Sequence, residues 1–290
     1  MLNSNFIIFV GLYLFTAVSH GLLARVSNKD SKMSPIKRAF IAIAFGTLPI
    51  TIVISAFSSF AVGDTSRAVL FLGLGALCAS LFHILIMTVL KHMTASRYQV
   101  MSGSYVVFAA LLSLILGESL SWAAVLGIAV VVLGIGFVAY SKDELKSDGR
   151  KYDLLALLAA LAVAGALVFQ SKATDYASNG VLLVGSSALQ ALILGVSTAV
   201  LPKESNKAGK KRSTLMPFVV LGVLNGVIGL IYLLAQNNSS SIALLTTSTS
   251  LSIPLSAIAG ILLLKERKSY GRKIVGSVLV FIGVVAFGLS

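Results

Sequence analysis

The residue of this sequence best suited to acid–base chemistry is His83, which stands within the apolar segment 68–90. It lies eight residues before Lys91, so in a membrane helix it would sit about 12 Å inside the bilayer at about 1.5 Å per residue. An imidazole titrates near neutral pH and can sense protons or bind a carboxylate, while the structural alternative is a neutral histidine hydrogen-bonded between helices. His83 is therefore a candidate proton-sensing group and a candidate cavity residue.

The other candidate binding residues are uncharged. Tyr98, Ser102 and Tyr105 have the i, i+4, i+7 spacing that places side chains on one helix face. A polar face on a membrane helix contacts protein or water rather than lipid, so this face either lines a cavity or makes interhelical hydrogen bonds. The remaining candidates for a solute cavity are amide, phenol and hydroxyl side chains, namely Gln190, Asn225, Tyr232, Thr246 and Ser250.

Catalytic and metal-binding chemistry finds little support. The ten acidic residues fall at the ends of apolar segments or between them, so no pair of aspartates lies within a segment, and the sequence has no G-x-S-x-G elbow. His20, Cys78 and His83 are too scattered for a metal site. We therefore predict no catalytic residue, no metal and no cofactor.

The elements that must position these residues are long apolar helices. Hydrophobic residues make up 57% of the 290 positions and charged residues 11%, which is far outside the soluble range. A helix needs about 20 apolar residues to cross a bilayer. Ten stretches meet this need and predict an all-α integral membrane protein: 6–24, 39–62, 68–90, 95–116, 122–140, 154–170, 180–201, 215–234, 242–264 and 274–289.

The net charge of +13 is distributed unevenly among the connections. Of the 23 lysines and arginines, all but Arg67 and Lys172 fall in alternate connections between the ten segments. This asymmetry is the positive-inside signature, so those connections are expected in the cytoplasm and both termini outside the cell membrane. Anionic lipid headgroups, rather than nucleic acid, are the expected neighbours of this charge.

The sequence also repeats. AALLSLILGE at 109–118 matches AIAGILLLKE at 257–266, and each run is followed by two glycines seven residues apart: Gly127 and Gly134, then Gly276 and Gly283. We expect two five-helix repeats, 1–140 and 154–290, joined by a polar linker at 141–153. Because five is odd, the second repeat enters the membrane with inverted topology, and sites in such proteins lie near the midplane between the halves.

These matching runs resemble the EamA-type domain of the drug/metabolite transporter superfamily. The resemblance implies a ten-helix protein whose cavity is lined by the first, third and fourth helices of each repeat. The fifth helix serves in packing or in a homodimer through helices five and ten. Family members usually carry a proline in the fourth helix, as Pro254 does in the second repeat, but Tyr105 and Val106 stand there in the first. The first-repeat helix is therefore expected to be straighter.

Three charged residues near helix ends allow structural or functional interpretations. Glu118 and Glu266 are expected to stabilise the first turns of helices five and ten, where the helix dipole favours an anion. Arg97 is expected either to reach the cytoplasmic interface or to bind an anion within the protein.

The function predicted from these features is alternating-access transport, by export or facilitated movement, of small metabolites such as amino acids. A lipid-carrier flippase, with Arg97 as a headgroup ligand, is an alternative, and an integral membrane enzyme is a more distant one.

Overall fold

The computed structural model of the protein describes residues 4–117, 121–139, 149–200, 214–238, 248–266 and 268–288. Within these ranges the chain is helical, apart from turns and one isolated β-bridge between Val62 and Ala177. The helices are α1 (Ser4–Lys29), α2 (Pro35–Ala42), η1 (Ile43–Thr47), α3 (Leu48–Ser55), α4 (Thr65–His92), α5 (Ala95–Ser102), α6 (Tyr105–Ile115), α7 (Trp122–Ala139), α8 (Gly149–Ala173), α9 (Asn179–Val200), α10 (Met216–Asn237), α12 (Ser252–Leu263) and α13 (Tyr270–Gly288).

Seven helical stretches in the described part of the chain are long and apolar enough to cross a membrane: α1, α2 to α3, α4, α5 to α6, α7, α8 and α9. Two shorter apolar helices cover 216–232 and 248–263. The expected all-helical, membrane-spanning class is thus confirmed over these ranges.

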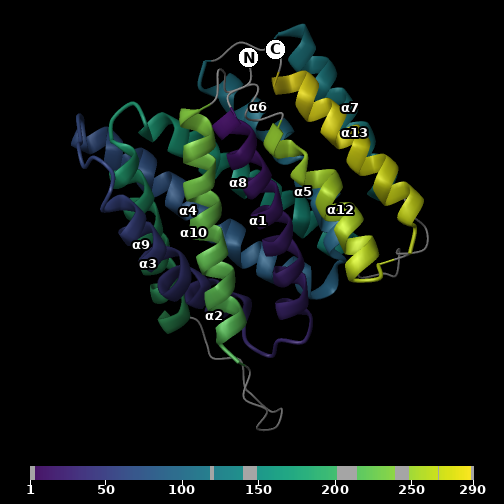
Figure 1. The fold of residues 1–290 in the computed structure, drawn as a ribbon, viewed down its shortest axis with the longest axis horizontal. Coiled ribbons are helices and arrows are strands. Elements are labelled where there is room, and N and C mark those ends of the chain that lie inside the picture. Colours follow the sequence, from purple (N-terminus) through teal and green to yellow (C-terminus); the bar gives the residue numbers. More distant parts are fainter. Residues whose placement is uncertain are drawn as a thin grey trace.

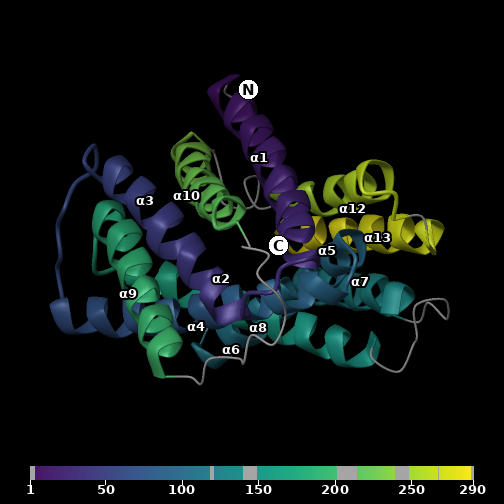
Figure 2. The same cartoon turned by 90° about the horizontal axis from the view of Figure 1, so that it is seen from below.

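The helices pack side by side as a bundle (Figure 1). Helices α7 and α13 run together at one side, α3 and α9 at the other, and α1 and α10 between them. Figure 2 shows α1 and α10 on one face of the bundle, with α4 and α8 on the opposite face. Helix α1 begins and α13 ends at the same end of the molecule.

The repeated glycines hold α7 against α13. A Cβ on Gly134 would lie 2.8 Å from the carbonyl oxygen of Gly276, and one on Gly283 would lie 2.5 Å from that of Gly127. Small residues allow such close backbone contact between membrane helices. Because the earlier glycine of one helix meets the later glycine of the other, the two helices are antiparallel. Their glycine faces contact each other within one chain, so a homodimer through these helices would have to use their other faces.

The second apolar segment changes helical pitch at η1, a single π-helical turn. The N–H of Leu48 donates to the carbonyl of Ile43, five residues earlier. The next residue, Pro49, has no N–H to donate, so the regular bond pattern is interrupted at this point. The turn ends at Thr47, whose hydroxyl donates to the carbonyl oxygen of Gly222 on α10 at 2.9 Å.

The expectation of a straighter fourth helix in the first repeat is wrong. The segment is interrupted at Gly103 and Ser104, between α5 and α6. There the N–H groups of Gly103 and Ser104 donate three residues back, to Val100 and Met101, and the Ser104 hydroxyl also donates to the Met101 carbonyl. Side-chain bonds of serine to the backbone compete with helical ones, so two serines flanking a glycine break the helix without proline. The second-repeat segment is also interrupted, at Leu251 before α12.

Candidate functional site

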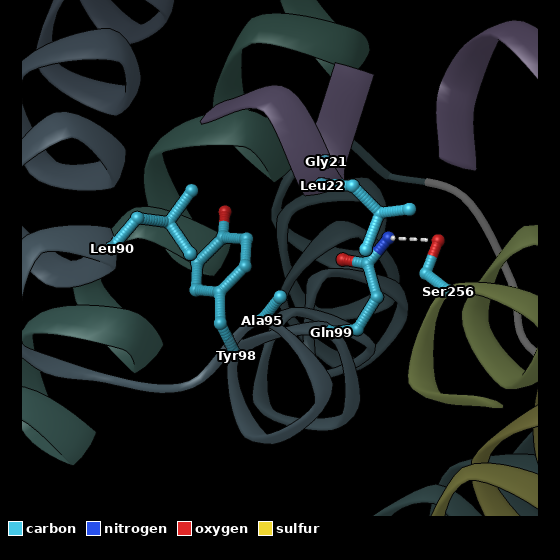
Figure 3. Close-up of a pocket in the computed structure, with 7 residues that line it drawn as sticks. All are labelled: Gly21, Leu22, Leu90, Ala95, Tyr98, Gln99 and Ser256. Atoms are coloured by element: carbon cyan, nitrogen blue, oxygen red, sulfur yellow. Dashed lines mark hydrogen bonds between the residues drawn. The ribbon is translucent and has the colours of Figure 1, made fainter. Parts of the chain in front are cut away.

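A small pocket lies where α1, α4, α5 and α12 meet (Figure 3). It is lined by Gly21, Leu22, Leu90, Ala95, Tyr98, Gln99 and Ser256. The Gln99 amide donates to the Ser256 hydroxyl at 3.1 Å, which joins α5 to α12. No charged side chain is among the lining residues of this pocket. Its polar groups can each exchange hydrogen bonds with an uncharged solute.

One of the predicted cavity residues lines this pocket, and a second contacts a lining residue. Tyr98 lines it directly and is buried. Ser102 supports it from one turn away, since its hydroxyl donates to the Gln99 carbonyl at 2.8 Å and lies 3.3 Å from the Gln99 side-chain oxygen. Gln99 and Ser256 were not among the predicted site residues. Gln99 lies directly beside Tyr98 in the sequence, which was the available signal.

Tyr105, the third residue of the predicted polar face, lies in a different group because the helix breaks before it. It interacts electrostatically with Tyr13 and with Tyr232. The rings of Tyr13 and Tyr232 are 6.0 Å apart between centroids. Three phenols from α1, α6 and α10 thus come together, two of them predicted.

His83 is buried on α4, with its ring 5.3 Å from that of Phe82. It also lies close enough to His20 of α1 for the two imidazoles to interact electrostatically.

The other predicted polar residues lie on α9, α10 and the segment before α12, away from the pocket. Gln190 is buried on α9 and its amide donates to Ser186 at 3.0 Å, while its side-chain oxygen has no hydrogen-bond partner among the described residues. Asn225 donates to the Thr47 hydroxyl at 3.4 Å. Ser250 is buried, and Thr246 lies outside the described residues.

Sequence reasoning missed a buried hydroxyl stripe along η1 and α3. Thr47, Thr51 and Ser55 are spaced four residues apart, so they share one face. Thr51 and Ser187 share a hydrogen bond of 2.7 Å, and the Ser55 hydroxyl donates to the carbonyl of Gly180 at 3.4 Å. The spacing was the signal that could have identified this stripe, which bonds η1 and α3 to α9 and α10.

One end of the molecule, which we call the basic end, gathers charged side chains around the start of α5. Arg97 forms a bidentate ion pair with Asp153 of α8, with distances of 3.0 and 2.7 Å. The side chains are 4% and 14% exposed. Arg97 therefore binds an anion within the protein, which is the second of its two expected roles. Its cation is not free for a lipid headgroup, which removes the observation that favoured a flippase.

Two other basic residues expected in connections lie within helices. Arg38 is in α2, where it is fully buried and its guanidinium donates to the Asn28 side chain. Lys273 is in α13 and donates to the Thr94 hydroxyl at 3.3 Å. Both helices begin four residues earlier than expected, at Pro35 and Tyr270.

The sequence suggested that Glu266 stabilises the first turn of α13, but the structure places its carboxylate elsewhere. Its carboxylate instead accepts hydrogen bonds from the N–H of Ala95 at 2.8 Å, the N–H of Ser96 at 2.9 Å and the Ser96 hydroxyl at 2.7 Å. Arg25 of α1 lies 3.8 Å from the same carboxylate. An anion at a helix N-terminus was the right interaction, but the helix is α5 rather than α13. Glu118 lies outside the described residues.

The opposite end holds the β-bridge and the two basic residues expected there. Asp64 begins α4 by accepting from the N–H of Arg67 at 3.1 Å. The Arg67 guanidinium lies 5.6 Å from the centre of the Tyr176 ring. Hydrogen bonds from the Ser66 hydroxyl and the Arg67 N–H keep the pKa of the Asp64 carboxyl below its ordinary value.

Comparison with known proteins assigns the chain to a class of transporters. The EamA-like transporter family model matches residues 7–140 and 150–289, so the protein belongs to this family of multi-pass membrane proteins. A putative ribose uptake protein RbsU of Latilactobacillus sakei subsp. sakei (strain 23K) is 28% identical over 262 residues, which cover 85% of this chain and 88% of that protein. A solved structure described only as the crystal structure of a protein superposes with a TM-score of 0.60 over 96% of this chain and 95% of its own, at 16% identity. It shares the fold.

Proposed function

We propose that this transporter carries a small, neutral, hydroxylated solute by alternating access between its two repeats. The observation that carries the proposal is the Gln99–Ser256 hydrogen bond in the pocket, because it joins two segments from the two family matches. A solute that replaces this bond would contact both halves at once.

The chemistry of the pocket favours a neutral solute. Burying a carboxylate or an ammonium group away from charged partners is strongly unfavourable. Tyr98, Gln99 and Ser256 instead offer donors and acceptors suited to hydroxyl groups. The similarity to a protein described as a putative ribose uptake protein supports a sugar-like substrate and inward movement. An amino acid, the other substrate class predicted from the sequence, would need partners for two charges.

Transport measurements on pocket variants test this assignment. In proteoliposomes, Gln99→Ala and Ser256→Ala are expected to reduce uptake of radiolabelled ribose by about tenfold each, since one lost hydrogen bond to a bound solute is about 1.4 kcal/mol. Uptake of the amino acid alanine by the same vesicles is measured for comparison. The control variant is Ser113→Ala, because Ser113 is a serine on α6 that does not line the pocket. Uptake of amino acids but not of sugars would refute the proposed substrate class.

We also propose that the chain crosses the membrane ten times with the second repeat inverted. Three more helical stretches would bring the seven long spans to ten, namely α10, 248–263 and α13. The antiparallel glycine contacts of α7 and α13 support inversion, since they are what a two-fold axis in the membrane plane would generate. A reporter fused after Ser290 is then expected outside the cell and one inserted at Lys207 inside. The reverse pair of readings would overturn the orientation.

His83 is the proposed proton-sensing residue. Glutamine keeps the hydrogen-bonding capacity of histidine but does not titrate near neutral pH. In His83→Gln we expect solute uptake to persist and its dependence on an imposed pH gradient to disappear. The His20→Gln variant is the matched comparison, since His20 faces His83 from α1. A gradient dependence that survives in His83→Gln excludes this residue as the sensor.

A further inference from the structure

The carboxylate of Glu266 closes the gap between the two repeats at the basic end. Its three hydrogen bonds all come from α5, in the first family match, whereas Glu266 lies in the turn between α12 and α13, in the second. Its side chain is only 7% exposed. Hydrogen bonds to an ionised acceptor are about twice as strong as neutral ones, so this contact is a substantial link between the halves.

The turn that carries Glu266 is shaped to direct the carboxylate at α5. Lys265 has φ of 55°, in the left-handed region that residues other than glycine seldom adopt. The N–H of Glu266 donates back to the carbonyl of Gly260, six residues earlier, at 3.3 Å, which closes the turn at the end of α12. A Cβ on Gly260 would lie 2.9 Å from Oε2 of Glu266 and 3.3 Å from the N–H nitrogen of Ser96. A strained backbone residue and an absent side chain thus both serve the same contact.

This contact forms the floor of the solute pocket. Ala95, whose N–H binds Glu266, lines the pocket. So does Leu90, whose carbonyl oxygen accepts from the Arg25 guanidinium at 2.6 Å. Arg25 in turn lies 3.8 Å from Glu266. The residues joined by these three contacts therefore lie between a solute in the pocket and the basic end.

We propose that Glu266, Arg25 and the first turn of α5 form a latch that opens each time the pocket is exposed at the basic end. This inference rests on the proposed transport function. On opening, the turn between α12 and α13 withdraws, while α5 stays with α8 through the Arg97–Asp153 ion pair. Water then solvates the separated carboxylate, guanidinium and N–H groups, so the contact can break and re-form in every cycle.

The accessibility of the pocket tests the latch without requiring any transported solute. Leu22 lines the pocket on α1, and Cys78 is the one cysteine of the chain. In the Cys78→Ala, Leu22→Cys protein we would measure the rate of alkylation by a membrane-impermeant maleimide added at the basic-end side of oriented vesicles. Glu266→Gln removes the charge but keeps one acceptor, and it is expected to raise the labelling rate by about tenfold.

Two further variants and one matched control make the result specific. Gly260→Ala displaces the carboxylate without changing charge, and Ser96→Ala removes only the hydroxyl bond; both are expected to raise the labelling rate. Asp64→Asn also alters a carboxylate that binds a helix N-terminus, but within its own helix at the opposite end, and it should leave the rate unchanged. Rates within about twofold of the parent for Glu266→Gln, or for Gly260→Ala and Ser96→Ala if the former does not fold, would overturn the latch.

The latch and the proposed function can fail separately in this design. Faster labelling in the latch variants of a protein that moves no ribose supports the latch and refutes the proposed substrate. Normal ribose uptake by the parent, together with unchanged labelling in every latch variant, retains the proposed function and refutes the latch.

Discussion

Gly222→Ala is expected to abolish accumulation of the folded protein. A Cβ at this position on α10 would overlap the carbonyl oxygen of Ala42 and lie 2.8 Å from the Cα of Gly46. Both neighbours are backbone atoms, so no side-chain rotation can relieve the overlap. Separating the helices would also break the Thr47 hydrogen bond to the Gly222 carbonyl. We expect a loss of more than about 3 kcal/mol, the upper end for overpacked sites, measured as the melting temperature and monodisperse yield in detergent.

Gly229→Ala provides the matched control for this prediction. Gly229 lies on the same helix, seven residues later, and a Cβ there would only reach Leu183 at 4.0 Å. Alanine is also the better helix former, so this variant should fold as well as the parent or better. Equal losses in the two variants would show that the close contact of α10 with η1 does not decide stability.

Arg97→Met is the second change with a large expected effect. Removing one partner of a buried ion pair leaves the other charge without compensation, which costs about 3–5 kcal/mol. Asp153 is 14% exposed and would be that remaining charge. The melting temperature should therefore fall strongly in Arg97→Met, and a second change, Asp153→Leu, should restore much of the loss because it removes the stranded carboxylate.

The exposed pair at the opposite end shows the contrast. Arg67 and Asp64 approach to 3.3 Å, but their side chains are 63% and 42% exposed. Solvent screens such pairs, so Arg67→Met should leave the melting temperature almost unchanged. If Arg67→Met and Arg97→Met had the same effect, burial would not be what gives the Arg97 pair its importance.

Features that depend on local pattern were predictable from the sequence. Apolar length defined the helices, and the family assignment from the repeated runs is confirmed by two matches to one family model. The resemblance implied packing for the fifth helix of each repeat, and the glycines at 127, 134, 276 and 283 provide it, because close contact between membrane helices requires small residues. Their exact partners follow from the antiparallel arrangement of α7 and α13, which the sequence only implied through the odd number of helices in a repeat.

Features that depend on distant partners were not predictable. Glu266 binds N–H groups about 170 positions away in the chain, and every helix presents such groups at its start. The same limit applies to Arg97, whose carboxylate partner lies on α8. The break at Gly103 escaped notice for a different reason: proline was taken as the helix breaker, whereas here Ser102 and Ser104 compete for backbone carbonyls.

The glycine contact of α7 with α13 has a consequence for biosynthesis. Gly127 leaves the ribosome well before Gly283, its eventual partner, because some 156 positions separate them. At about 5–20 residues per second, the nascent α7 would wait on the order of ten to thirty seconds in the bilayer with its glycine groove filled only by lipid chains. The membrane insertion machinery must therefore either shield this groove or tolerate temporary partners until the last helix is released from the translocon.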